Sequence, residues 1–153
     1  MNVGIVSSHH YVEYSGTYKG MEFVVLFNSG GYRTAYVNVK NTFLENLDYM
    51  ECDNYVDVHC GFTYKECRLP FEHSDSENYN WLGWDYAHYC DGYDLNTLQR
   101  YFGNSDYLTM KSLSFMNNLD ESVYIYTLLD VMSECKKVII QIKKGETNEE
   151  TNR

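Results

Sequence analysis

Four potential metal ligands lie close together in the middle of the sequence. Asp85, His88 and Asp91 recur at every third position at the end of an aromatic segment, and His59 lies upstream of them. Carboxylate oxygens and imidazole nitrogens are the donors that bind borderline and hard divalent cations, including zinc. The pattern therefore predicts a divalent metal site, with zinc as the expected ion, formed by His59, Asp85, His88 and Asp91.

Two other interpretations of these residues stay open. Cys60 and Cys90 flank the ligand candidates, so a thiolate could replace one of the oxygen donors. Without a metal, His88 would hydrogen-bond to Asp85 or Asp91 and shape the turn that follows the aromatic segment.

Motifs for other kinds of catalysis are missing from the sequence. It contains no GxSxG, P-loop or GxGxxG pattern, so serine hydrolases and nucleotide-binding folds receive no support. Cys60 is a nucleophile candidate because it follows His59, but neighbours on a strand point to opposite faces. Cys60 falls on the apolar face, and we therefore expect it to be a buried structural thiol. No catalytic residue is expected.

Two strand-like segments are predicted to position the ligand candidates. Residues 56–64 alternate between apolar and mostly polar side chains, and residues 79–86 place Leu82, Trp84 and Tyr86 on one face and Trp81, Gly83 and Asp85 on the other. In each segment, the polar face combines a glycine with a ligand candidate, His59 or Asp85. Pairing of the two strands would leave open space beside both ligands, on the face away from the helix-packed core.

The rest of the chain predicts an α+β fold in which a small, mostly antiparallel sheet packs against a long C-terminal helix. Segments 20–27 and 32–39 are β-branched and aromatic, and the turn sequence between them predicts a hairpin. A short helix is expected near residues 95–102. Between residues 120 and 143, apolar side chains recur at spacings of three and four, which predicts the long helix. The apolar positions are Ile125, Leu128, Met132, Cys135, Ile139 and Ile142.

Capping residues suggest where this helix begins and ends. Asn118 or Asp120 can cap its start, and Gly145 can close it. We therefore expect one α+β domain over residues 1–145 and a disordered C-terminal tail over residues 146–153.

Composition indicates a soluble protein with reduced thiols. The five cysteines are odd in number and form no CxxC pair, which argues against a disulfide framework. No apolar run has the length of a membrane span, and the N-terminus lacks the pattern of a signal peptide. The expected location is the cytoplasm, without membrane contact.

The whole net charge of −10 lies in one third of the chain. Residues 45–94 contain twelve acidic and two basic residues, and the remainder is neutral. Such a surface repels phosphates, so direct nucleic-acid binding is not expected. It suits a cation or a basic groove on a protein partner, and the 16 tyrosines are typical of protein interfaces. A solvated surface that only aids solubility is the alternative.

Both ligand-bearing segments resemble a known pattern. His59-Cys-Gly-Phe-Thr63 and Gly83-Trp-Asp-Tyr-Ala-His-Tyr-Cys-Asp91 resemble the HGGLT…GFDxAHxGD pattern of small phage and prophage proteins, and the likeness covers most of residues 17–143. The recurrent polar positions of that family fall on all four ligand candidates. This chain departs from the pattern at Cys60, Phe62 and Cys90, which puts a shared substrate pocket in doubt.

The resemblance implies a function in counter-defence. Some small acidic phage proteins of this type are anti-CRISPR inhibitors of RNA-guided nucleases. The chain would then bind and inhibit a Cas effector nuclease in the cytoplasm of the host bacterial cell, with a structural metal. The alternative is a small metal-dependent hydrolase, in which His59, Asp85 and His88 hold the cation and Asp91 is the general base.

Overall fold

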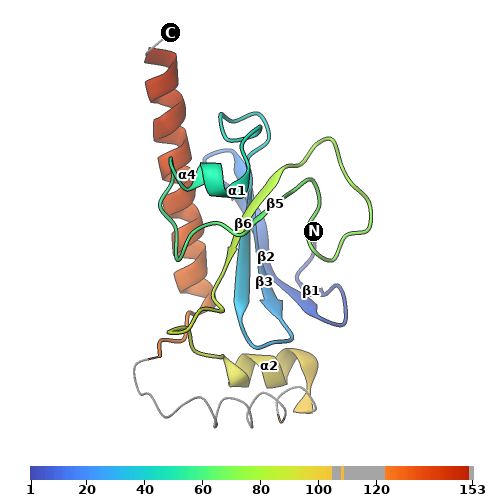
Figure 1. Cartoon of the computed structure of the whole chain (residues 1–153). Coiled ribbons are helices and arrows are strands. Elements are labelled where there is room, and N and C mark those ends of the chain that lie inside the picture. Colours follow the sequence, from blue (N-terminus) through green and yellow to red (C-terminus); the bar gives the residue numbers. More distant parts are fainter. Residues whose placement is uncertain (105–107, 109–122, 152–153) are drawn as a thin grey trace.

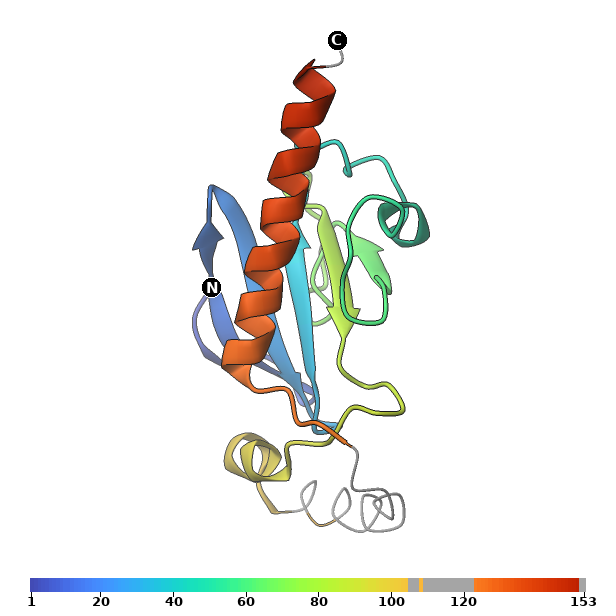
Figure 2. The same cartoon turned by 90° about the vertical axis from the view of Figure 1, so that its left-hand side faces the viewer.

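One antiparallel sheet and one long helix make up most of the protein. The computed structural model describes residues 1–104, 108 and 123–151. The strands are β1 (Gly4–Ile5), β2 (His10–Tyr18), β3 (Met21–Asn28), β4 (Arg33–Asn38), β5 (Tyr64–Glu66) and β6 (Trp81–Asp85), and the helices are α1 (Tyr49–Cys52), α2 (Leu95–Phe102) and α4 (Leu128–Thr151). The six strands pair in the order β1-β2-β3-β4-β6-β5, and α4 lies across one face of the sheet (Figures 1 and 2). The predicted α+β fold is confirmed.

The centre of the sheet is the hairpin that the turn sequence predicted. β3 pairs with β4 in antiparallel register from Phe23 opposite Val37 to Phe27 opposite Arg33. Seven of the eight β3 residues are buried, because α4 covers one face and loop residues near Leu69 cover the other. β3 therefore reads as a nearly continuous apolar run, as strands buried on both faces do.

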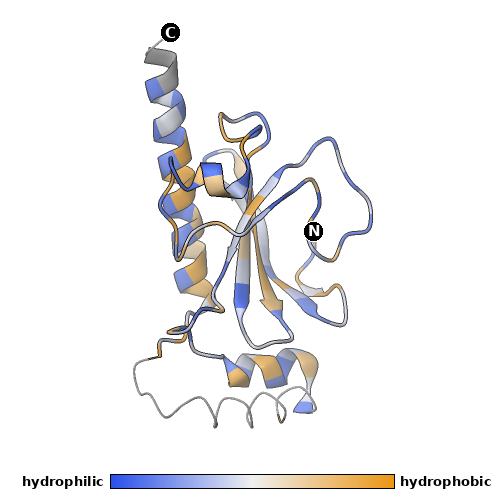
Figure 3. Ribbon diagram, in the orientation of Figure 1, coloured by the Kyte–Doolittle hydropathy of each residue, from blue (hydrophilic) through white to orange (hydrophobic). Residues whose placement is uncertain are grey.

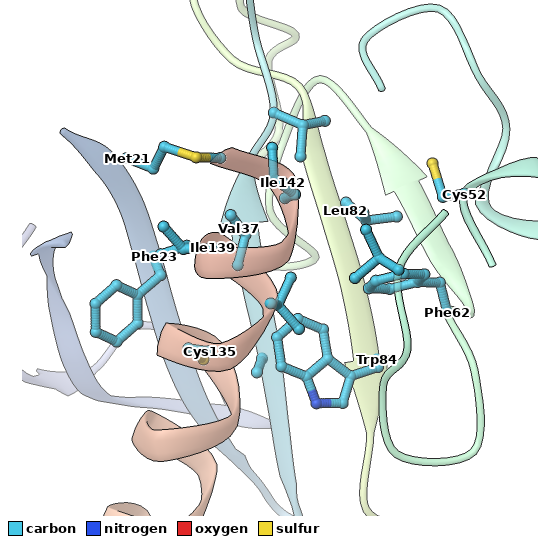
Figure 4. Packing of buried hydrophobic residues seen from close by; sticks show 14 of the residues in the cluster. Met21, Phe23, Val37, Cys52, Phe62, Leu82, Trp84, Cys135, Ile139 and Ile142 are labelled. Atoms are coloured by element: carbon cyan, nitrogen blue, oxygen red, sulfur yellow. The ribbon is translucent and has the colours of Figure 1, made fainter. Parts of the chain in front are cut away.

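The main core lies between the sheet and α4. Alternate residues of β3, β4 and β6 point toward the helix, so that Leu82 and Trp84 of β6 lie in one cluster with Cys135, Ile139 and Ile142 of α4 (Figure 4). The predicted helical stripe is confirmed at these three positions. Hydrophobic residues of α4 gather where it covers the sheet, and its C-terminal end projects past the sheet and is hydrophilic (Figure 3).

The two ends of α4 differ from the prediction. Thr127 caps the start of the helix. Its hydroxyl accepts a hydrogen bond from the Asp130 N–H, and the Asp130 carboxylate accepts one from the Thr127 N–H. Asn118 and Asp120 lie outside the described residues, and Ile125 precedes the helix and is exposed.

Gly145 does not end the helix, which continues to Thr151 through part of the segment expected to be a disordered tail. A Cβ atom at Gly145 would lie 2.6 Å from the Phe43 ring, so the glycine permits close packing within the helix.

The predicted strand over residues 56–64 is mostly wrong. Only Tyr64–Glu66 pairs with β6, and residues 53–63 form turns and irregular backbone. Phe62 and Val56 still point into the core, but they reach it from a loop. The alternation of apolar and polar residues therefore correctly indicated which side chains are buried, but it did not indicate a strand.

A buried arginine joins four parts of the fold. The guanidinium of Arg33 donates two hydrogen bonds to Glu13, one to Asp94 and one to the Tyr126 carbonyl. Arg33 is 4% exposed and Glu13 7% exposed. Glu13 lies at a β-bulge between Val12 and Tyr14. Through this cluster, β2 and β4 are tied to the start of α2 and to the segment that leads into α4.

Asp94 makes this cluster sensitive to pH. Burial alone would raise the pKa of Asp94, but hydrogen bonds from Thr97 and Arg33 hold it below its ordinary value. A carboxyl with a lowered pKa in the folded protein stabilises the fold at neutral pH, and this stabilisation is lost as pH falls through the lowered pKa.

We therefore expect the free energy of unfolding to fall as the pH drops below about 4, the ordinary pKa of an aspartate. Asp94→Asn, which keeps a helix-capping side chain, should reduce stability at pH 7 and flatten this pH dependence. Urea unfolding over a pH series measures both quantities. The matched variant Asp75→Asn changes an exposed carboxylate and should leave the profile unchanged; a wild-type profile for Asp94→Asn would contradict the prediction.

Candidate metal centre

His59 and Cys60 lie at the tip of a tight turn. The Gly61 N–H donates to the Val58 carbonyl, and Cys60 and Gly61 have φ angles of 55° and 86°. Positive φ is ordinary for glycine but strained for cysteine. The turn brings neighbouring side chains together that a strand would send to opposite faces.

Helix α4 holds this turn in place through polar side chains. The Glu134 carboxylate accepts a hydrogen bond from the His59 N–H. The Gln141 side chain accepts from the Asp57 N–H and donates to the Asp57 carbonyl. On the other side of the turn, Asp53 accepts from the Phe62 N–H. The backbone groups that a neighbouring strand would have paired are thus satisfied by side chains.

Asp91 comes from the turn that follows β6. Its main chain pairs with the segment before α4, since the Gly92 N–H donates to the Tyr124 carbonyl at 2.8 Å. Its carboxylate is 3.0 Å from Nε2 of His59 and 3.1 Å from Nδ1 of His88, and it accepts a further hydrogen bond from the His88 N–H. Asp91 therefore links the two histidines, which the sequence placed 29 residues apart.

The electrostatics of Asp91 favour its ionised form. Burial alone would raise the pKa of Asp91, but hydrogen bonds from the His88 backbone and from the rings of both histidines lower it below the ordinary value. The His59 ring also stacks on Tyr86, with centroids 4.7 Å apart. A carboxylate and an aromatic ring thus fix the orientation of this imidazole.

His59, Cys60 and His88 can hold a metal ion. One donor atom from each residue lies within 4.8 Å of the others. Donors around a tetrahedral zinc ion lie about 3.3–3.8 Å apart, given bond lengths of about 2.0–2.3 Å, so the group needs a contraction of roughly 1 Å to close on an ion. A carboxylate that holds the second ring nitrogen of a ligating histidine is the usual partner at such sites, and Asp91 is placed for that role.

This group shares two members with the predicted ligand set. His59 and His88 are brought together as expected, whereas Cys60 joins them and Asp85 and Asp91 do not belong to the group. Asp85 is directed elsewhere: it accepts hydrogen bonds from the Thr63 hydroxyl and the Ala87 N–H. It stays 3.7 Å from Nε2 of His88, within reach of a fourth ligand position.

Two other expectations about the site are wrong. Cys60 is exposed rather than buried in the apolar core, because it lies in a turn and not on a strand. His59 lies on the helix side of the sheet and not on the opposite face, as its contact with Glu134 shows. Partial burial and the carboxylates of Asp91 and Asp85 raise the pKa of the Cys60 thiol, so Cys60 is not an activated nucleophile.

Sequence reasoning missed the residues of α4 that position the site. Glu134 and Gln141 are seven residues apart and share a helix face, two turns from each other. That spacing marks a polar stripe beside the apolar one, but no sequence signal says what such a stripe contacts.

A surface hollow adjoins His59. Its volume is about 420 Å³, and its lining includes Tyr86, Tyr126, Glu134 and Lys137. The metal-binding group is therefore accessible from one side.

Comparisons with known proteins add no family to these observations. No protein-family model, curated protein or solved structure matches this chain.

None of the helices within the described residues has an apolar stretch of membrane-spanning length.

The strained turn gives a stability prediction. A non-glycine residue at positive φ costs roughly 1 kcal/mol relative to glycine. We therefore expect Cys60→Gly to raise the free energy of unfolding by up to about 1 kcal/mol in the presence of a chelator. Urea unfolding with EDTA measures the change.

Cys90→Gly is the matched control, because Cys90 is also exposed but does not have positive φ. Glycine there should be neutral or destabilising. Equal effects of the two substitutions would contradict the interpretation of the turn.

Proposed function

We propose that this protein is an inhibitor that binds the basic nucleic-acid groove of an RNA-guided Cas nuclease, with a structural zinc ion at His59, Cys60 and His88. The proposed setting is the cytoplasm of a bacterial host infected by the phage that encodes it. The nuclease as partner follows from the sequence resemblance, and the binding mode follows from an exposed surface around α1.

That surface combines negative charge with exposed apolar side chains. We call it the α1 surface, and it consists of the exposed acids Asp48, Glu51, Asp53 and Asp57 together with the exposed Tyr49, Met50 and Tyr55. Aromatic and methionine side chains supply contact area at the centre of protein interfaces, and charge of one sign attracts a partner of the opposite sign. The combination is the observation that carries the proposal.

The proposed metal has a structural task at this surface. The turn that carries His59 and Cys60 directly follows the α1 surface. The connection between the two is fixed by hydrogen bonds: the Asp53 carboxylate accepts one from the Phe62 N–H, and the Asp57 N–H donates one to the Gln141 side chain. An ion at His59, Cys60 and His88 would join this connection to the end of β6. It would therefore limit the motion of the α1 surface and reduce the entropy lost on binding.

Zinc is the ion that suits these donors. Two imidazoles and a thiolate are borderline to soft ligands, which zinc accepts in tetrahedral sites. Asp85, whose carboxylate lies 3.7 Å from Nε2 of His88, is the candidate for a fourth position. We expect one zinc ion per chain by elemental analysis of the purified protein, and its loss in His88→Ala.

His73→Ala is the matched control, because His73 is an exposed histidine in the loop before β6. It should keep the full zinc content. Absence of stoichiometric metal in the wild-type protein, or loss of metal in both variants, would overturn the zinc site while leaving the α1 surface to be tested separately.

The α1 surface is tested by binding to guide-loaded Cas nucleases. The double variant Asp57→Lys/Met50→Ser reverses one charge and removes one apolar side chain, and it should weaken binding and inhibition of target-DNA cleavage by at least about tenfold. Wild-type binding should weaken as salt rises. Glu22→Lys/Leu129→Ser makes the same kinds of change at exposed positions elsewhere and should have little effect; equal effects of the two doubles would exclude the α1 surface.

A metal-dependent hydrolase is the second candidate, and the hollow beside His59 favours it. A substrate in that hollow would lie next to His59, and Glu134 and Asp130, which also line the hollow, would be the carboxylates available as a base. Asp91, the base expected from the sequence, is 8% exposed and engaged by both histidines. Its carboxylate is therefore poorly placed for that role.

A further inference from the structure

A second hollow lies on the face of the sheet opposite α4. It has a volume of about 400 Å³, which is within the range of small-molecule sites. Residues at alternate positions of β4, Thr34 and Tyr36, form its floor, and Asp85 at the end of β6 forms one side. The metal-binding group and the α1 surface do not contribute to it.

Tyrosine rings form much of its wall. Tyr32, Tyr36 and Tyr64 all line the hollow, and the rings of Tyr36 and Tyr64 are nearly perpendicular, with centroids 5.1 Å apart. Tyr32 packs over Gly30, where a Cβ atom would lie 2.7 Å from its ring. The glycine thus allows the ring to lie close to the backbone.

Asp85 supplies the charge of this hollow. Among the residues that the structure describes, no lysine or arginine lines it. His10 also lines the hollow, and burial and then His9 lower its pKa, which favours the neutral imidazole. Burial and then the charge of Asp85 raise the pKa of Tyr32, which indicates that the carboxylate and the phenol share one environment.

The Asp85 carboxylate has capacity for a ligand. Its two oxygens each accept one hydrogen bond, from the Ala87 N–H and the Thr63 hydroxyl. A carboxylate offers about four acceptor positions. The side chain is also 25% exposed, so the remaining positions are reachable from solvent.

We propose that this hollow binds a small organic cation of the ammonium class. A carboxylate in a hollow whose described lining holds no lysine or arginine attracts positive charge, and tyrosine ring faces stabilise ammonium groups through cation–π contacts. The same field repels phosphates and carboxylates. The proposal depends neither on a bound metal nor on the proposed protein partner, although Asp85 also lies 3.7 Å from Nε2 of His88.

The experiment uses choline as the probe, with methyl α-glucoside and acetate as neutral and anionic alternatives. Titration into the wild-type protein is followed by ¹H–¹⁵N chemical shifts. Choline should cause saturable shifts at Tyr32 and Asp85 and acetate should cause none there. Binding of the glucoside at least as tight as that of choline would overturn the cation and assign the hollow to neutral polyols.

Two variants locate the binding. Asp85→Asn keeps the shape and removes the charge, and Tyr32→Leu removes a ring that is not part of the metal-binding group; each should weaken choline binding at least tenfold. Glu77→Gln removes an exposed charge outside the hollow and should change it less than twofold. Choline affinity within threefold of wild type in both hollow variants would refute the proposal. Zinc content of Asp85→Asn, measured in parallel, separates an effect on the metal from an effect on the hollow.

Discussion

The buried guanidinium of Arg33 is the constraint on which the rest of the structure depends. Removing a charge from water is costly, and only a full set of partners offsets that cost. Glu13, Asp94 and the Tyr126 carbonyl supply that set from three separate parts of the chain. The chain must therefore bring β2, α2 and the segment before α4 to the end of β4 together. The β-bulge at Glu13 is part of this arrangement, because a bulge re-aims a side chain that regular pairing would direct elsewhere.

The candidate metal centre depends on this constraint indirectly, through the segment that precedes α4. The Arg33 contact with Tyr126 places the segment before α4, and Tyr124 of that segment pairs with the main chain on both sides of Asp91. Asp91 then holds the rings of His59 and His88. From the opposite side, Glu134 and Gln141 of α4 hold the turn that carries His59. A helix and a buried carboxylate thus position the two histidines, and neither histidine lies on a strand.

Much of the fold could be predicted from the sequence, because periodicity reports burial. The hairpin, β6, α2 and the apolar stripe of α4 were all readable in this way. Periodicity reports which side chains are buried but not what satisfies the backbone, and the segment 56–64 was misjudged for that reason. Its apolar residues reach the core, but Gln141 and Asp53 take hydrogen bonds that a strand would give to its neighbour. The same error placed Cys60 on a buried face, although the sequence leaves its thiolate open as a ligand; its exposed place beside His59 requires a left-handed backbone conformation. Gly145 was misread because the packing of Phe43 against it is non-local.

Asp85 shows how one strand end can serve two environments. Strand alternation directs Trp84 and Tyr86 toward α4 and Asp85 toward the other face, so the carboxylate leaves the metal-binding group that its spacing from His88 suggested. It nevertheless remains 3.7 Å from His88, because the chain turns immediately after β6. A residue in this position is available to a fourth metal position on one side and to the tyrosine-lined hollow on the other. Movement of its side chain toward His88 would withdraw the one carboxylate that the described residues contribute to the hollow, so occupation of the two sites would be coupled through this side chain.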